Sequence, residues 1–83
     1  MNVTDTFATP AAPDWSDAPP GWNWLAQDED GRWFWYAVQP QAGIGGGVWR
    51  APRRAQQFAA QGTPNPVWHQ TCHQRPPGGN TPR

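Results

Sequence analysis

Three residues near the C-terminal end, His69, Cys72 and His73, have side chains that could bind a metal ion or attack a substrate. Imidazole nitrogen and thiolate sulfur are typical zinc ligands, and on a helix their i, i+3, i+4 spacing would place them on one side. On a strand the two histidines face one way and the cysteine the other, so the three groups cannot converge. Cys72 also lacks the orienting group and the oxyanion site that a nucleophile requires. We therefore predict no metal site, no cofactor and no catalytic cysteine.

Three consecutive acids, Asp28, Glu29 and Asp30, could supply carboxylates for acid–base catalysis or for a cation site. They directly precede Gly31 and a run of aromatic residues, a setting in which Asp and Gly are favoured because they fit a tight turn. The glycine-rich stretch 43–47 lacks the Lys-Ser/Thr pair that follows a phosphate-binding loop. Because no nucleophile, base or metal set is assembled, we expect a protein that is not an enzyme.

The aromatic residues on either side of this turn are expected to form the folded centre. Aromatic side chains fit the pleated, half-buried surface of a strand, so residues 22–27 and 32–38 are predicted to pair as a hairpin. Side chains alternate across a strand, which places the two tryptophans of the second strand on one face and Phe34 and Tyr36 on the other.

The length of the loop decides which faces of the two strands coincide. A loop of two or four residues would put the tryptophans of the first strand beside those of the second, whereas an odd loop with Gly31 in a bulge would reverse this. We expect the even loop because it gathers four indoles into one wall, and each buried aromatic side chain removes about 150–250 Å² from water. The predicted structural core is therefore Trp22, Trp24, Trp33 and Trp35.

The composition is that of one small domain that depends on tryptophan. The chain has 83 residues, of which seven are Trp and one is Cys. A single cysteine excludes an internal disulfide, and a chain of this size buries only about 60% of its surface, so the indoles must supply the core. We expect residues 1–19 to be an extended, flexible arm, 20–75 to be the domain and 76–83 to be a disordered tail. No apolar stretch suits a membrane span or a secretion signal, so we expect no membrane contact and a cytoplasmic location.

The net charge is zero, but the two signs are separated along the chain. Every acid precedes Gly31, every base follows it, and all six bases are arginine. Such asymmetry can steer a partner. The neutral total argues against a duplex nucleic-acid binder, which needs a basic surplus to displace counterions. Arginine without lysine favours planar, bidentate contacts at an interface.

The second half of the chain is predicted to complete the sheet and to add a helix. Residues 48–50 form a short third strand in this interpretation. Pro52 suits the first turn of a helix over 53–61, which Gly62 ends. Residues 67–73 are ambiguous between a strand and a short helix, and we prefer the strand. The predicted fold class is α+β: a three- to four-stranded antiparallel β-meander with one short helix and disordered ends.

Part of this pattern resembles the WW domain. The shared skeleton is Pro20-Gly21-Trp22, then Gly31-Arg32-Trp33-Phe34-Trp35, then Trp49-Arg50-Ala51-Pro52. The resemblance implies a small core of Trp22, Trp35 and Pro52. It also implies a groove formed by Phe34 and Trp49, in which a proline-rich peptide would bind.

Segments from more of the chain are similar to small proteins of tailed phages and prophages. They are Asp14-Trp15-Ser16-Asp17-Ala18-Pro19, the aspartate-glycine turn before the aromatic strand, and Asn65-Pro66-Val67-Trp68 with Arg75-Pro76. Several proteins of that source inhibit host machinery, and anti-CRISPR proteins are among them. The resemblance implies a phage or prophage inhibitor of a host factor, located in the cytoplasm of a bacterial host cell.

The expected function is non-enzymatic binding to another protein, an unidentified host protein. Exposed aromatic and arginine side chains mark interfaces. The predicted contact residues are Phe34, Tyr36, Trp49, Arg50, Arg53 and Arg54. Two alternatives remain open: a WW-like module that binds a proline-rich peptide, and a single-stranded nucleic-acid binder that stacks bases on its aromatic rings. Nucleic acid is the less expected partner because the chain carries no basic surplus.

Overall fold

The structure, a computed structural model, describes residues 12–77. In chain order its elements are η1 (Trp15–Asp17), β1 (Trp24–Gln27), β2 (Arg32–Tyr36), β3 (Gln41–Ala42), β4 (Trp49–Arg50), η2 (Arg53–Ala55), β5 (Gln56–Gln61), η3 (Trp68–Gln70) and β6 (His73–Gln74). The η elements are single turns of 3₁₀ helix, so the described part contains no α-helix. No helix within it is long and apolar enough to cross a membrane.

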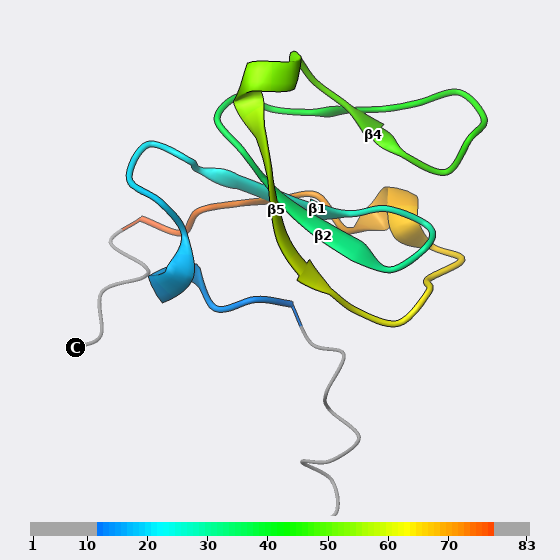
Figure 1. Ribbon diagram of the computed structural model, residues 1–83, viewed down its shortest axis with the longest axis horizontal. Coiled ribbons are helices and arrows are strands. Elements are labelled where there is room, and N and C mark those ends of the chain that lie inside the picture. Colours follow the sequence, from blue (N-terminus) through cyan, green and yellow to red (C-terminus); the bar gives the residue numbers. More distant parts are fainter. Residues whose placement is uncertain (1–11, 78–83) are drawn as a thin grey trace, which may run out of the picture.

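The strands form a four-stranded sheet and a separate two-stranded sheet, and every pairing is antiparallel. The larger sheet has the order β5-β2-β1-β6, so β1 and β2 lie at its centre. Between β2 and β5 the chain leaves this sheet to form the β3–β4 hairpin, which is drawn above it in Figure 1. The predicted antiparallel sheet is confirmed, but the predicted third strand, 48–50, pairs with β3 in the separate sheet, and the last strand pairs with β1.

The turn between β1 and β2 has an odd length, so the predicted even loop is wrong. Asp28 donates its backbone N–H to the Arg32 carbonyl (2.9 Å), which leaves residues 29–31 as the loop. Gly31 has a φ of 96°, a left-handed conformation that other residues rarely adopt. A Cβ at this position would also collide with the Gly62 carbonyl. Glycine is therefore required here both by the turn and by the neighbouring chain.

The odd loop divides the aromatic residues between two faces of the hairpin, because directly opposed residues share a face. One face, which we call the indole face, is built on Leu25, Trp33 and Trp35, with Trp15, Ala18, Trp22, Ala59 and Ala60 packed against them. The other, which we call the tyrosine face, is built on Ala26, Tyr36 and Trp49, with Trp24, Phe34, Ala51, Trp68 and Cys72 packed against them.

The single wall of four indoles is therefore wrong. Trp33 and Trp35 are buried, whereas Trp22 and Trp24 are half-buried. Trp24 lies on the tyrosine face, because a change of one residue in loop length moves a whole strand's side chains to the other side. Trp15 takes its place on the indole face, with its ring centre 5.2 Å from that of Trp35.

A residue from the C-terminal end fixes the segment that precedes β1. Arg75 Nε donates to Asn23 Oδ1 (2.9 Å), and its Nη2 donates to the carbonyls of Pro19 (3.1 Å) and Trp22 (3.0 Å). Its guanidinium carbon also lies 5.3 Å from the centre of the Trp15 ring. This part of the predicted arm therefore packs on the domain; the rest of the arm and most of the predicted tail lie outside the described residues.

Residues 53–61 do not form the predicted helix. One 3₁₀ turn, η2, ends at Ala55, and the chain then continues as β5 alongside β2. These residues are good helix formers, but β2 has a second edge whose N–H and C=O groups need partners, and β5 supplies them. A shift of register at Ala59 marks a β-bulge in this pairing.

The segment 67–73 contains elements of both predicted alternatives. It begins with the turn η3, and only at His73 does it join the sheet, opposite Leu25. Between them, Thr71 Oγ1 accepts the backbone N–H of Gln27 (2.9 Å) and contacts the Trp68 carbonyl (2.6 Å). A side chain therefore extends the attachment to β1 beyond the short strand.

Candidate partner-binding surface

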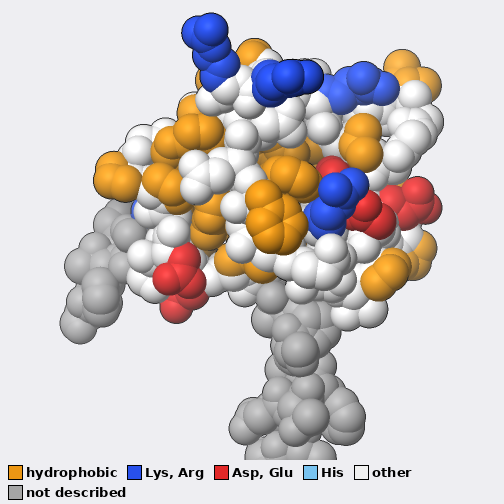
Figure 2. Space-filling view, viewed as in Figure 1, with side chains coloured by type: hydrophobic (Ala, Val, Ile, Leu, Met, Phe, Trp, Pro, Cys, Tyr) orange, Lys and Arg blue, Asp and Glu red, His pale blue; other side chains and the backbone are white. Residues whose placement is uncertain are grey.

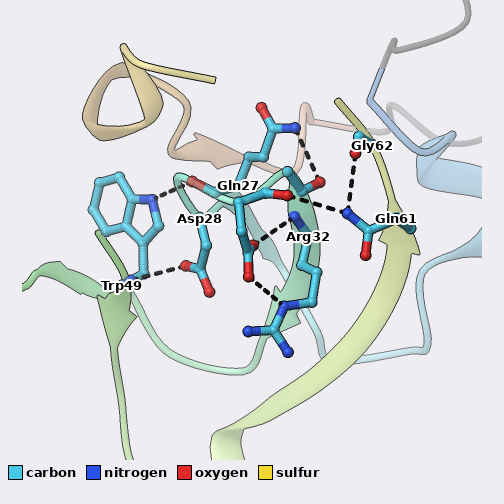
Figure 3. A network of polar contacts seen from close by, with 8 residues as sticks. Gln27, Asp28, Arg32, Trp49, Gln61 and Gly62 are labelled. Atoms are coloured by element: carbon cyan, nitrogen blue, oxygen red, sulfur yellow. Dashed lines mark hydrogen bonds and ion pairs between the residues drawn. The ribbon is translucent and has the colours of Figure 1, made fainter. Parts of the chain in front are cut away.

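Trp49, predicted as a partner contact, is 9% exposed and belongs to the tyrosine face. Its backbone N–H donates to Asp28 Oδ1 (2.9 Å) and its indole N–H donates to the Gln27 carbonyl (3.0 Å), as Figure 3 shows. The ring meets Trp68 edge to face, with ring centres 5.8 Å apart. Because the ring is buried and both N–H groups are paired internally, Trp49 is corrected from a contact and groove residue to a core residue.

Tyr36, also predicted as a partner contact, is fully buried at 0% exposure. Burial raises the pKa of its phenol far above the usual range, with smaller contributions from Asp28 and Cys72. The hydroxyl has no hydrogen-bond partner among residues 12–77. Alternation correctly places Tyr36 on the face of Phe34, but β4 and η3 cover that part of the face, so Tyr36 is a core residue as well.

Phe34 remains half-buried and has an aromatic neighbour that the sequence did not indicate. Phe58 is 53% exposed, and the two rings meet edge to face with their centres 5.8 Å apart. The Arg32 guanidinium lies 5.9 Å from the centre of the Phe34 ring. Phe58 belongs to β5, where it lies opposite Phe34 at the edge of the sheet. The exposed Phe58 ring and the half-buried Phe34 ring therefore lie together at this edge of the sheet, with the Arg32 guanidinium beside Phe34.

The three arginines predicted to contact a partner, Arg50, Arg53 and Arg54, are all exposed. The ion pair found within residues 12–77 joins Arg32 to Asp30 (2.8 Å), so these three have no acidic partner in that part of the chain. Basic side chains gather along the upper edge of the molecule in Figure 2, where Figure 1 places η2 and the β3–β4 hairpin. We call Arg50, Arg53 and Arg54 the arginine rim.

Short, well-anchored elements hold the arginine rim. Arg50 ends β4, opposite Gln41 in the two-stranded sheet. Pro52 restricts the backbone before η2. At the end of η2, Ala55 is buried and its carbonyl accepts the Ala37 N–H (2.9 Å), which ties the turn to the chain that leaves β2. The rim is thus carried by backbone that is fixed to the sheet.

Gln27 is the centre of a polar network that the sequence analysis did not predict (Figure 3). It is 3% exposed, and its amide nitrogen donates to the carbonyls of Gly31 (3.0 Å) and Thr63 (3.1 Å). Its amide oxygen accepts from Asn65 Nδ2 (3.0 Å). Every end of the buried amide is therefore paired, and it joins the β1–β2 turn to the connection between β5 and η3. A glutamine that ends an otherwise apolar strand was the available signal.

The three turn acids do not form a paired carboxylate site. Asp28 is 5% exposed, whereas Glu29 and Asp30 are exposed. Burial raises the pKa of the Asp28 carboxyl, and this outweighs the opposite effect of the hydrogen bond from Trp49. Asp28 therefore acts as an acceptor that fixes β4 to the hairpin.

His69, Cys72 and His73 lie on three successive pieces of backbone: η3, the connection after it, and β6. No group of three metal-binding side chains occurs among residues 12–77. Cys72 packs against the tyrosine face, and burial raises the pKa of its thiol. A raised pKa keeps a thiol protonated, and a protonated thiol is a poor nucleophile.

The chain matches no known family model, no curated protein and no solved structure. The described residues also enclose no cavity or cleft for a small ligand.

Proposed function

We propose that this protein acts by binding another protein, with the arginine rim pairing to acidic residues of that partner. The observation that carries the proposal is the presence of three exposed guanidinium groups on adjoining elements, none paired with an acid within residues 12–77. A guanidinium group is planar and can donate two parallel hydrogen bonds to one carboxylate. Arginine is also enriched among the residues that dominate interface energetics.

Two exposed apolar side chains lie next to the rim. Ile44 is 98% exposed on the loop between β3 and β4, the hairpin that carries Arg50. Val38 is 44% exposed and follows Ala37, whose N–H is bonded to Ala55 at the end of η2. Apolar side chains beside charged ones are typical of interfaces, because a partner buries the former and pairs with the latter.

Replacement of Arg50 by Glu tests the proposal, because it reverses one charge of the rim on an exposed side chain. We expect the immobilised variant to lose a protein that the wild type captures from a bacterial lysate, while the urea midpoint of unfolding stays unchanged. Gln74→Glu is the control, since it adds a negative charge on β6, the edge of the sheet opposite β5. Equal capture by Arg50→Glu and by the wild type would contradict a role for the rim.

The phage or prophage origin and the inhibition of a host factor stay predictions, because they depend on resemblance alone. Binding of a proline-rich peptide is less well supported, since the buried Trp49 cannot provide one wall of a groove. Stacking of single-stranded nucleic acid on Phe34 and Phe58 is also less well supported, because the adjacent Arg32 already pairs with Asp30.

A further inference from the structure

β5 leaves backbone hydrogen-bonding groups free along the outer edge of the larger sheet. Its sequence from Gln56 to Gln61 contains no charge and no proline, the residues that commonly protect an edge strand from pairing with other chains. No strand within residues 12–77 pairs with its outer side. β6, at the opposite edge, has only two residues and is followed closely by Pro76, which has no N–H. An added strand therefore fits β5 better than β6.

Phe58 directs its backbone groups away from the sheet. The Ala55 carbonyl accepts the Ala37 N–H (2.9 Å), so Ala55 bonds toward β2. Alternate residues of an antiparallel strand bond to opposite neighbours, so Gln57 also bonds toward β2 while the N–H and C=O of Phe58 face away. Phe58 is also 53% exposed. A free backbone and an exposed ring therefore coincide at one residue.

Gln56 adds one free carbonyl, and Ala59 ends the free segment. The Gln56 N–H donates to the Arg53 carbonyl, so the outward-facing C=O of Gln56 is the group left to pair. After Phe58 the bulge at Ala59 breaks the alternation of the strand. A partner strand can therefore form a short ladder over 56–58, and a ladder this short needs support from side chains.

Unpaired positive charge lies at the start of β5. Arg53 and Arg54 begin η2, directly before the strand, and neither has an acidic partner within residues 12–77. Figure 2 shows basic side chains along the upper edge, where Figure 1 places this end of β5. At the other end Arg32 lies opposite Gln61, but its guanidinium is already paired with Asp30 (2.8 Å). An acidic residue of an added strand therefore finds an unpaired guanidinium group at the start of β5 and a paired one at its end.

We propose that β5 binds an extended acidic segment of another protein as an added edge strand. The backbone of this segment pairs with the Gln56 carbonyl and with both backbone groups of Phe58. An apolar side chain of the segment lies beside the Phe58 ring, because directly opposed residues share a face. Its acidic residues lie beside Arg53 and Arg54, since neighbouring strands are about 4.8 Å apart and an arginine side chain is longer than that. One ligand thus accounts for the free backbone, the exposed ring and the unpaired charges.

The added strand rests on the proposed function, because Arg53 and Arg54 belong to the arginine rim. It adds the form of the partner's contact, an extended segment. The two proposals fail in different ways, since Arg50 lies on the separate two-stranded sheet. Loss of lysate capture in Arg50→Glu, with peptide binding that ignores changes in β5, would remove the added strand alone. Normal capture by Arg50→Glu, with peptide binding that depends on β5, would remove the role of Arg50 alone.

Selection from a random peptide library displayed on phage, against the immobilised full chain, supplies the probe. We expect the selected peptides to combine alternating β-branched or aromatic residues with acidic residues at one end. A synthetic copy of the commonest peptide is then titrated against each variant. Arg53→Glu/Arg54→Glu should weaken its binding about tenfold, because charge pairs become like-charge contacts. Gln74→Glu, at the opposite edge of the sheet, should bind like the wild type.

A proline substitution tests the backbone of Phe58. Phe58→Pro removes the outward N–H and keeps the bonds to β2, because proline is tolerated on an edge strand where its N side faces solvent. We expect it to weaken binding about tenfold, whereas Phe58→Ala, which loses only the ring, should weaken binding about two- to fivefold. Gln74→Pro is the matched control: Arg75 donates its N–H to the Asn23 carbonyl (2.7 Å), so the Gln74 N–H also faces outward, and this variant should bind like the wild type.

Amide hydrogen exchange measured by NMR reads the added ladder in the wild type. The Phe58 N–H should exchange rapidly in the free protein and about tenfold or more slowly with saturating peptide. The Gln57 N–H faces β2, so it should be protected in both states. This measurement also decides the matter if circular dichroism shows that Phe58→Pro is unfolded.

Three outcomes would overturn the added strand. They are selected peptides without acidic residues, binding that is equal in the wild type and in a folded Phe58→Pro, and a Phe58 amide that exchanges equally fast with and without peptide. The second outcome would show that a partner meets the arginine rim through side chains alone.

Discussion

The two faces of the β1–β2 hairpin are closed by different interactions. The indole face is covered by apolar contacts from η1, from the chain that precedes β1, and from the alanines of β5. The tyrosine face is covered by β4 and η3, and here Trp49 and Thr71 also hydrogen-bond to the backbone of Gln27. The stability lost by a substitution on the indole face should therefore depend on the apolar area it removes. On the tyrosine face it should depend also on how many polar groups it leaves without a hydrogen bond.

Each face also buries one polar atom without a partner among the described residues, Trp33 Nε1 on one and the Tyr36 hydroxyl on the other. Such a group costs about 1–3 kcal/mol. A buried aromatic ring removes about 150–250 Å² from water, which at about 25 cal/mol/Å² is worth about 4–6 kcal/mol. The apolar term is larger, so both faces tolerate the unpaired atom.

The largest loss of stability should follow Trp35→Ala on the indole face. Trp35 is 3% exposed and contacts Trp15, and removal of a buried aromatic ring costs about 3–5 kcal/mol. Urea unfolding followed by circular dichroism measures this loss. Phe58→Ala, at the exposed edge of β5, is the control and should cost about 1 kcal/mol or less. Equal costs for the two variants would contradict the assignment of the indole face as a core.

Gln27→Ala should lower the free energy of unfolding by about 2–4 kcal/mol, and it tests the contribution of hydrogen bonds instead of apolar area. The change leaves the carbonyls of Gly31 and Thr63 and the amide of Asn65 without this partner. Thermal unfolding measures this loss. The control is Gln57→Ala, which replaces an exposed glutamine on β5 and should change stability by less than about 0.5 kcal/mol. If both glutamine variants unfold at the same temperature as the wild type, the network does not stabilise the fold.

Arg75→Ala should cost about 2 kcal/mol and should loosen only the cover of the indole face. It removes three hydrogen bonds to the segment before β1 and the contact with Trp15. Hydrogen exchange should accelerate around η1 and leave β4 and η3 unchanged, whereas the control Arg54→Ala should leave all three unchanged. Uniform acceleration across the sheet would show that the two faces do not open separately.

The smallest expected effect is a pH-dependent gain in the free energy of unfolding from Asp28→Asn. Burial raises the pKa of this carboxyl above its ordinary 3.8, so the folded state holds the proton more tightly than the unfolded state. The stabilisation that the protonated carboxyl gives the folded state is therefore complete below a pH of 3.8, and it is lost as the pH rises through the folded-state pKa. Asparagine keeps an oxygen for the Trp49 N–H without a charge, so the variant should be more stable at neutral pH by about 1 kcal/mol or less.

Urea unfolding of both proteins between about pH 3 and pH 8 measures this difference. The advantage of Asp28→Asn should shrink as the pH falls. An advantage that grows toward low pH would mean that the folded state stabilises the carboxylate, contrary to the direction that burial gives.

Part of the candidate site could be predicted from charge alone. Arg50, Arg53 and Arg54 are exposed because an unpaired guanidinium group cannot be buried at acceptable cost, whatever the fold. The aromatic contacts could not be predicted in the same way. Tyr36 and Trp49 are buried because segments far along the chain cover them, and Phe58 is exposed because its strand lies at an edge.

The sequence by itself determined an antiparallel aromatic hairpin, because the aspartate-glycine turn and the strand preference of aromatic residues act locally. It did not determine which side each ring takes. Aromatic residues occupy every position from 33 to 36, so both faces are apolar and the hydrophobic pattern does not select a loop length. Tertiary structure decided which face each ring takes. It also made residues 56–61 a strand, because pairing the free backbone groups at the edge of β2 stabilises the fold more than the weak helix preference of these residues would.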